Sequence, residues 1–232
     1  MKTRKNMKTF LRIGMWALCF ATALDISASP KDGIYHKGWI DFNKNGKMDV
    51  YEDPDASVEA RVRDLLNQMT VDEKTCQMAT LYGSGRVLKD AVPTEKWKQE
   101  IWKDGIGNID EQHNGLGEFG SEYSFPYTKH VKTKHELQRW FVEQTRLGIP
   151  VDFTNEGIRG LCHDRATYFP SQSGQGATWN KQLIARIGEV EAKEADALGY
   201  TNIYSPILDI AQDPRWGRAV ETYGEDPYLV GQ

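Results

Sequence analysis

The chain has 232 residues, 39% of them hydrophobic and 27% charged, which is typical of a globular protein with room for one large domain or two small ones. The formal net charge is −4, so no broad basic surface indicates a nucleic-acid partner. Seven tryptophans and ten tyrosines are many for this length, and they suit either a packed core or faces that stack on sugar rings.

Residues 1–29 are typical of a secretory signal peptide. The first twelve residues include five basic and no acidic side chains, and the apolar run IGMWALCFATAL and the small residues at 27–29 follow. The apolar run is too short for a stable membrane span. Leu18, directly before Cys19, disfavours lipid attachment because that position calls for a small residue. We therefore expect an exported protein, periplasmic or extracellular.

Residues 30–56 form a polar extension that contains the pattern of a calcium-binding loop. In DFNKNGKMDVYE, residues 41–52, oxygen-bearing side chains take the first, third, fifth, ninth and twelfth places, and glycine takes the sixth. The seventh residue would offer its backbone carbonyl. The alternative is an Asn-Gly turn with solvated acids. We expect a structural Ca²⁺ whose ligands are Asp41, Asn43, Asn45, Lys47, Asp49 and Glu52.

Two helices and a strand are predicted after residue 57. Apolar residues recur at helical spacing from Val58 to Met69. The capping-box pair Thr70 and Glu73 then begins a second helix over about 71–81. A short strand is predicted at 106–109.

From residue 130, long helical patterns alternate with short apolar strands. Thr133 and Glu136 form another capping-box pattern, and Gly148 ends the helix that follows. Its predicted inward face consists of Val131, Leu137, Trp140, Phe141 and Leu147.

Three further elements and the start of a fourth complete the series. A strand is predicted at 149–156, a helix from about 179 to 198, a second strand at 201–210, and the first turn of another helix at 225–232. The helix from 179 would turn inward the residues Leu183, Ile184, Ile187, Val190 and Leu198. This alternation predicts parallel βα units.

The two most charged loops, NEGIRGLCHDRAT and QDPRWGR, both follow predicted strands, where an α/β barrel carries its chemistry. The first loop has one histidine among scattered acids and lacks the spacing of a metal site. A loop of mutually paired charges and a rim that binds sugar hydroxyls stay open as alternatives. Asp209 lies near a predicted strand end and is therefore a candidate nucleophile. Glycoside cleavage needs two carboxyl groups at a set separation, which the sequence does not give.

Several stretches resemble glycoside hydrolase family 3, which includes β-glucosidases and β-xylosidases. They are IPVDFTNEGIRG, ATWNKQLIARIGEVEAKEADALG and SPILDIAQDPRWGRAVETYGEDPYLV. The resemblance runs from about Leu65 to the last residue. It implies an α/β fold in which residues 57–232 form the amino-terminal half of a (β/α)8 TIM-type barrel.

The resemblance also implies retaining hydrolysis of terminal β-linked sugars, in an oligosaccharide or an aryl glycoside. Glu156 and Arg218 match residues that hold the sugar hydroxyls in the innermost subsite. In the same interpretation Asp209 and Asp213 hold the loop in place, with Arg215, Glu221 and Glu225 as partners within it.

The nucleophile, the acid/base residue and the Lys-His pair of the family have no counterpart in this chain, so no catalytic residue is assigned. We expect the chain alone to be poorly stable and inactive, as the amino-terminal part of a longer enzyme. The alternatives are a non-catalytic exported carbohydrate-binding protein and a calcium-binding module. Whether Cys76 and Cys162 form a disulfide stays open.

Overall fold

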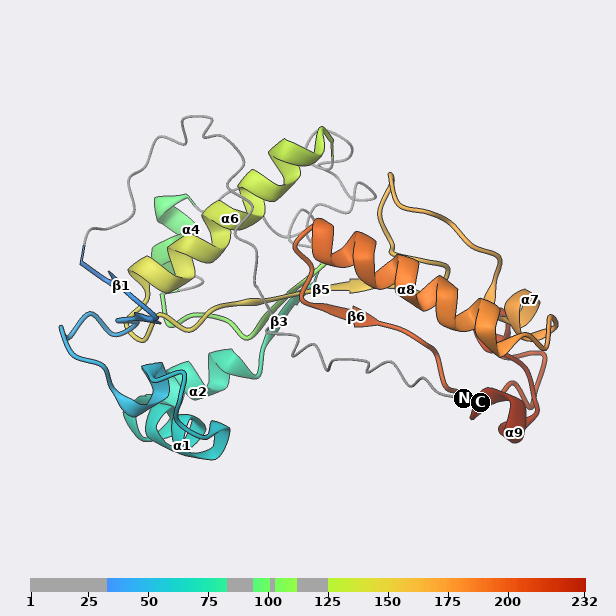
Figure 1. Ribbon diagram of the computed structural model, residues 1–232, viewed down its shortest axis with the longest axis horizontal. Coiled ribbons are helices and arrows are strands. Elements are labelled where there is room, and N and C mark those ends of the chain that lie inside the picture. The colour runs from blue at the N-terminus through green and yellow to red at the C-terminus, as the bar shows by residue number, and fades with distance from the viewer. Residues whose placement is uncertain (1–32, 83–93, 101–102, 112–124) are drawn as a thin grey trace, which may run out of the picture. The chain divides into compact units, whose positions relative to one another are not determined.

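The computed structural model describes residues 33–82, 94–100, 103–111 and 125–232. The predicted signal peptide lies outside these residues. A parallel four-stranded sheet organises the described part of the chain (Figure 1). Its order is that of the sequence: β3 (Thr80–Tyr82), β4 (Asn108–Asp110), β5 (Asp152–Glu156) and β6 (Asn202–Tyr204).

The first strand of this sheet was not predicted. Helix α2 (Val71–Gln77) ends earlier than its pattern suggested, and β3 follows after two residues. The three-residue strand is too short for its alternation to be distinguished from the end of a helix. The predicted strand at 201–210 is also shorter in the structure, because Pro206 follows β6 closely and cannot donate to a ladder.

Two helices precede the sheet. Helix α1 (Val58–Gln68) begins at Ser57, whose side chain accepts a hydrogen bond from the Ala60 N–H. Helix α2 begins with the predicted capping box, in which Thr70 and Glu73 satisfy one another's backbone N–H groups. The hairpin of β1 (Tyr35–His36) and β2 (Trp39–Ile40), and a 3-10 turn η1 (Val50–Glu52), lie before α1.

Helix α6 (Tyr127–Gln144) begins six residues before the predicted capping box, so that prediction is wrong. Thr133 lies inside the helix, and its hydroxyl donates to the Lys129 carbonyl at 2.9 Å. Val131, predicted to face inward, is 42% exposed, because in this turn the buried face of the helix is formed by His130, Thr133 and Lys134. Leu137 and Phe141 are fully buried, as predicted.

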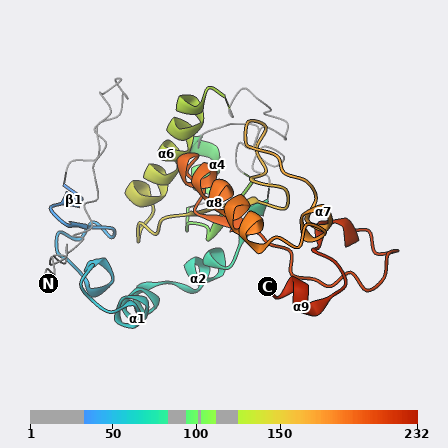
Figure 2. The ribbon, with the colours of Figure 1, turned by 45° about the vertical axis from the view of Figure 1, so that its right-hand side comes forward.

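Helix α8 (Lys181–Ala197) begins at Asn180, whose side chain accepts from the Leu183 N–H. Ile187 is buried as predicted, whereas Leu183 is 39% exposed. The first turn of α8 lies beside α7 (Gln172–Gly176) and α9 (Pro227–Val230), which Figure 2 shows. The short elements α4 (Glu95–Glu100) and η2 (Ala219–Glu221) complete the described set.

The hydrophobic core joins the sheet to α6 and α8. It consists of Ile106, Ile109, Leu137, Trp140, Phe141, Val151, Phe153, Leu161, Ala195, Leu198 and Tyr200. The parallel α/β fold is therefore confirmed, and the described strands form an open sheet rather than a closed barrel. No helix in the described ranges is both long and apolar enough to cross a membrane. The boundary at residue 56 stays a prediction.

Candidate functional site

The carboxyl ends of the parallel strands carry a group of acidic side chains. Strand β4 ends at Asp110 and is followed by Glu111, and β5 ends at Glu156. In the sheet register Asp110 pairs with Thr154, and Glu156 pairs with Tyr204. This edge is where parallel α/β sheets place their ligand sites.

Glu156 is half-buried in a field of neighbouring charges. Burial raises the pKa of Glu156, and the carboxylates of Asp110 and Glu111 raise it further, whereas the guanidinium of Arg218 lowers it. The pKa of Arg218 is raised, first by its hydrogen bond to Glu221 and in smaller part by Glu156. Glu156 and Arg218 thus lie close enough to interact electrostatically.

The loop after β5 fixes the position of Glu156. Asn155 is fully buried, and its side-chain amide donates to the Cys162 carbonyl at 2.8 Å. The Cys162 N–H donates in turn to the Glu156 carbonyl at 2.7 Å. These bonds fold the segment after β5 back onto the end of the strand and so fix the backbone at Glu156.

Further along this loop, the charged residues pair with one another. His163 is fully buried and its Nδ1 accepts from the Arg165 N–H at 3.1 Å. Asp164 lies 3.4 Å from His163 and 3.6 Å from Arg165. Within the described ranges no group of three or more His, Cys, Asp or Glu residues is placed to hold a metal ion. Cys76 and Cys162 are free thiols.

The loop from 213 to 228 is held by local ion pairs. Asp213 binds Arg215, with oxygen–nitrogen distances between 2.6 and 3.1 Å. Arg218 binds Glu221 through both Nε, at 2.7 Å, and Nη2, at 2.6 Å. Asp213, Arg215 and Glu221 thus take part in local ion pairs, and their role in holding the loop stays a prediction, whereas Glu225 is exposed and has no such partner among the described residues. The Arg218 side chain is 53% exposed, so a ligand can reach it.

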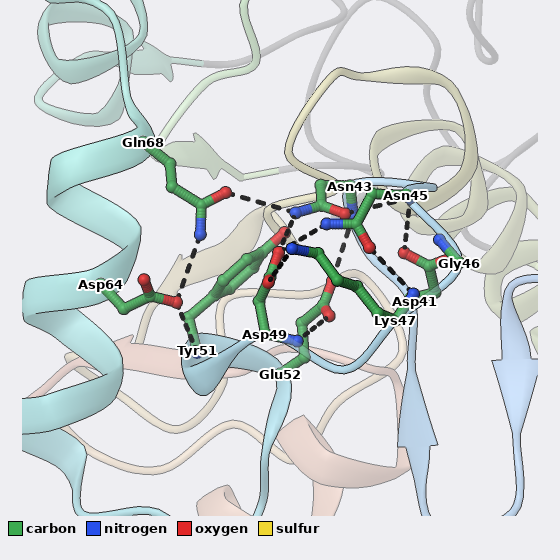
Figure 3. Close-up of polar contacts among 10 residues, drawn as sticks. All are labelled: Asp41, Asn43, Asn45, Gly46, Lys47, Asp49, Tyr51, Glu52, Asp64 and Gln68. Carbon is green, nitrogen blue, oxygen red and sulfur yellow. Dashed lines mark hydrogen bonds and ion pairs between the residues drawn. The ribbon is translucent and has the colours of Figure 1, made fainter.

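The predicted calcium loop is compact and hydrogen-bonded throughout (Figure 3). The Asp41 carboxylate accepts from the Asn45 N–H at 3.0 Å and from the Gly46 N–H at 2.8 Å. The Glu52 carboxylate accepts from the Asn43 N–H at 3.2 Å and from the Asp49 N–H at 2.8 Å. Both acidic residues are 2% exposed. Gly46 has a φ of +82°, as the sharp bend requires.

The donors in this loop are oxygens of the kind that Ca²⁺ prefers, but two amides are turned the other way. The side-chain N–H groups of Asn43 and Asn45 donate to Asp49 Oδ2 at 2.6 and 2.7 Å (Figure 3). Rotation of each amide by half a turn would direct its oxygen toward the same region. The residues therefore fit a calcium ion in chemical type, but the described structure does not bring Asp41, Asp49 and Glu52 together as a metal-binding group, so the fit requires these two rotations and a rearrangement of the carboxylates.

Comparison with known proteins identifies the family to which this chain belongs. Residues 70–232 match the model of the glycosyl hydrolase family 3 N-terminal domain. The chain belongs to glycoside hydrolase family 3. The match ends at the last residue and includes both loops that carry Glu156 and Arg218.

Relatives of this family 3 chain are named as β-xylosidases and β-glucosidases. A putative β-xylosidase of Formosa agariphila is 31% identical over 78% of this chain and 23% of its own length. A periplasmic β-glucosidase of Salmonella typhimurium is 30% identical over 74% of this chain and 19% of its own length. The chain thus spans about a fifth to a quarter of these relatives.

Solved structures agree with this assignment. A β-glucosidase from Erythrobacter marinus superposes with a TM-score of 0.64 at 29% identity, covering 79% of this chain and 23% of that one. An exo-1,3/1,4-β-glucanase from a Pseudoalteromonas species gives 0.62 at 30% identity, covering 76% and 21%. The described residues within 70–232 therefore have the fold of the family's N-terminal domain.

Sequence reasoning missed part of the acidic edge. Asp110 is 3% exposed, and its Oδ1 accepts from the Thr154 hydroxyl at 2.7 Å. Glu111 has a φ of +52° and accepts from the Tyr82 hydroxyl at 3.2 Å. The available signal was that Asp110 and Glu111 directly follow the strand predicted at 106–109. Because β3 was not predicted, the sequence did not show that Tyr82 at the end of β3 would lie beside these acids.

Proposed function

We propose that this chain is the amino-terminal part of an exported β-glycosidase that acts on terminal β-linked sugars. Family membership and the relatives, which are named β-glucosidases and β-xylosidases, support the reaction. The signal-like residues 1–29 and a relative named as periplasmic support export. These relatives favour a hydrolase over a non-catalytic binding protein.

In this proposal Glu156 and Arg218 hold the hydroxyls of the terminal sugar. The observation that carries it is that the Arg218 guanidinium lies close enough to Glu156, the last residue of β5, to lower its pKa, although the two residues are more than fifty positions apart. A carboxylate accepts hydrogen bonds from hydroxyl groups and a guanidinium donates to them, so the pair matches both sides of a diol. The neighbouring Glu221 holds Arg218 in place at 2.7 Å.

Binding of isofagomine and of glucose, measured by calorimetry, tests this assignment. We expect Arg218→Ala to weaken binding by about 10- to 100-fold, because a charge-assisted hydrogen bond contributes about 1.5–3 kcal/mol. Arg215→Ala is the matched control, since Arg215 lies in the same loop and pairs with Asp213. Equal affinities for the two variants would contradict the role of Arg218.

We further propose that this chain by itself binds sugar without cleaving it. Retaining hydrolysis needs two carboxyl groups about 5–5.5 Å apart across the glycosidic bond. The family resemblance assigns neither of them to a residue of this chain. The purified 232-residue chain should therefore release no chromophore from a chromogenic β-glucoside. Turnover that disappears in Glu156→Gln would show that the described acids do cleave the bond.

We also propose that the loop at 41–52 binds one structural Ca²⁺. Asp41, Asp49 and Glu52 would supply charge, Asn43 and Asn45 would turn their amide oxygens inward, and Lys47 would contribute its backbone carbonyl. The support is the match to the twelve-residue pattern and the burial of Asp41 and Glu52. The Ca²⁺ ion would neutralise these carboxylates and so hold the extension of residues 30–56 in one conformation.

Terbium luminescence sensitised by Tyr51 tests the calcium site directly. We expect Ca²⁺ to displace Tb³⁺ from the wild-type chain and to raise its Tm, and we expect Asp49→Asn to lose both effects. Asp55→Asn, an exposed acid just outside the loop, should keep them. If the Asp49 and Asp55 variants respond alike, the loop is an Asn-Gly turn with no ion.

A further inference from the structure

A cavity of about 120 Å³ lies behind the loop that presents Glu156. It is lined by the segment after β5, by α7 and α8, by the residues just after β6, and by Tyr223. Its polar lining comes from Gln172, Gln175, Glu191, Ser205 and Tyr223. Neither the sugar site nor the calcium loop uses these side chains.

Three buried oxygen atoms of residues that line this cavity lack a hydrogen-bond partner within the described ranges. They are Oε1 of Gln172, Oε1 of Gln175 and Oε1 of Glu191, and the three residues are 1%, 4% and 7% exposed. Buried acceptors in folded proteins almost always have a partner. Three unpartnered acceptors around one cavity therefore point to a bound species that accepts electron pairs.

The orientation of Gln175 is fixed by a second contact. Its side-chain N–H donates to the Pro170 carbonyl at 2.8 Å, which assigns the nitrogen to that side and leaves the oxygen as the unpartnered atom. This amide cannot rotate without losing that bond. The unpartnered atom of Gln175 is therefore its oxygen.

We propose that this cavity binds a monovalent metal cation, Na⁺ or K⁺, through the oxygens of Gln172, Gln175 and Glu191. All three donors are hard oxygens, which suit such ions. Glu191 is the single carboxylate in the cavity lining, so one monovalent ion makes the buried site neutral. A divalent ion would leave an unbalanced positive charge among buried atoms, which is costly.

The chemistry of Glu191 agrees with this site. Burial raises the pKa of its carboxyl group to about 7, because a buried negative charge without a counterion is disfavoured. Hydrogen bonding by the Ser205 side chain lowers the pKa of Glu191 in smaller part. A bound cation would remove this cost.

The ion would stabilise the protein near the sugar-binding edge. Gly157 directly follows Glu156, and a Cβ atom added there would lie 1.7 Å from Glu191 Oε1. The backbone at Gly176 in α7 also packs tightly, since a Cβ atom added there would lie 2.3 Å from the Tyr223 carbonyl oxygen. The cavity thus lies between the loops that carry Glu156 and Arg218. The inference does not require that either residue binds sugar.

Thermal unfolding of the full chain in matched salts tests this inference. We expect Tm to be about 2–4 °C higher in NaCl or KCl than in choline chloride at equal ionic strength. EGTA, which binds Ca²⁺ far more strongly than Mg²⁺, is present in every buffer and removes any contribution of calcium at the 41–52 loop. Glu191→Gln should abolish the difference, and Glu189→Gln, an exposed acid on the same helix, should preserve it.

Diffraction from wild-type crystals soaked with Tl⁺ gives a second test that does not depend on whether a variant folds. An anomalous peak in the cavity, within bonding distance of Gln175 Oε1 and Glu191 Oε1, is the expected result. Waters alone in the cavity would overturn the proposal, as would equal Tm values for the wild-type chain in sodium, potassium and choline salts. Stabilisation by Mg²⁺ alone would also overturn it.

Discussion

At the scale of single residues, the acidic edge is a set of coupled charges. Glu156 is surrounded by Asp110 and Glu111 on one side and by Arg218 on the other. Like charges disfavour ionisation and an opposite charge favours it, so the protonation of Glu156 depends on each neighbour. A carboxylate that holds sugar hydroxyls must be ionised to act only as an acceptor.

Glu111→Gln tests this coupling. Removal of one negative neighbour should lower the pKa of Glu156, because the ionised form is then less strongly repelled. Sugar binding should consequently persist to lower pH in the variant. Carboxyl ¹³C NMR of Glu156 measures the shift directly. An unchanged pKa would show that Glu111 is screened from Glu156 by solvent.

A second residue-scale feature is the buried amine of Lys134. It is 4% exposed, its Nζ has no hydrogen-bond partner among the described residues, and it lies 2.9 Å from the centre of the Tyr200 ring. Burial lowers the pKa of Lys134 well below its usual value. The folded protein therefore disfavours the proton that the unfolded chain binds below pH of about 10.

Lys134→Met should stabilise the protein at pH 7 by about 1–3 kcal/mol. Because the unfolded state binds the extra proton, the lysine costs stability below its unfolded pKa, and this cost falls as pH rises toward about 10. The variant should therefore show a flatter dependence of unfolding free energy on pH between about 7 and 10. Urea denaturation of both chains, with the exposed Lys132→Met as control, measures the difference.

At the scale of elements, one ion pair ties α2 to the segment after α6. Arg146 Nε donates to Glu73 Oε1 at 2.9 Å, and its Nη2 donates to Glu73 and, at 2.8 Å, to the Gln68 carbonyl. Burial raises the pKa of Glu73, but the hydrogen bonds from Arg146 and Thr70 outweigh it, so the net shift is downward. The same carboxylate closes the capping box of α2.

Glu73→Gln should destabilise the fold by about 1–3 kcal/mol at pH 7, since a charge-assisted bond and part of a cap are lost together. A depressed pKa means that the stabilisation is present above the unfolded value and disappears as pH falls through the folded one. The variant and the wild type should thus converge in acid. Asp72→Asn, exposed on the same helix, should change stability by less than about 0.5 kcal/mol.

Local signals predicted elements well where the chain carried its own boundary marks. The capping box at Thr70 marks a helix start in the structure, and the helix predicted from about 179 to 198 lies within two residues of α8 at each end. The same kind of pattern at Thr133 failed, because a Thr hydroxyl inside a helix can bond the carbonyl four residues earlier. The polar lining of the cavity was harder to predict: Gln172 and Glu191 are buried only because α7 and α8 meet there.

At the scale of the whole molecule, the described sheet has two strands with a partner on one side only, β3 and β6. Their burial is low, and Tyr204 on β6 is 41% exposed. Unpaired backbone groups on such a strand can pair with a strand of another chain. The family of the chain is shown by its sequence. Whether the sheet pairs with a strand of another chain depends instead on whether other residues cover β3 and β6.

Tyr204→Lys should reduce self-association of the 232-residue chain, because a charge on an edge strand opposes pairing between copies. Sedimentation velocity over a concentration series measures the effect. Tyr228→Lys is the matched control, since Tyr228 is 72% exposed but lies on α9. An equal reduction in both variants would indicate general solubility rather than strand pairing.

The close approach of Gly157 to Glu191 also restricts how this chain can vary. Any larger residue at 157 would collide with the carboxylate, at 1.7 Å from the new carbon, and with the Ile203 side chain at 2.5 Å. A shorter residue at 191 relieves only the first of these collisions. In a library with both positions randomised, we therefore expect few correctly folded variants without glycine at 157, whatever residue occupies 191.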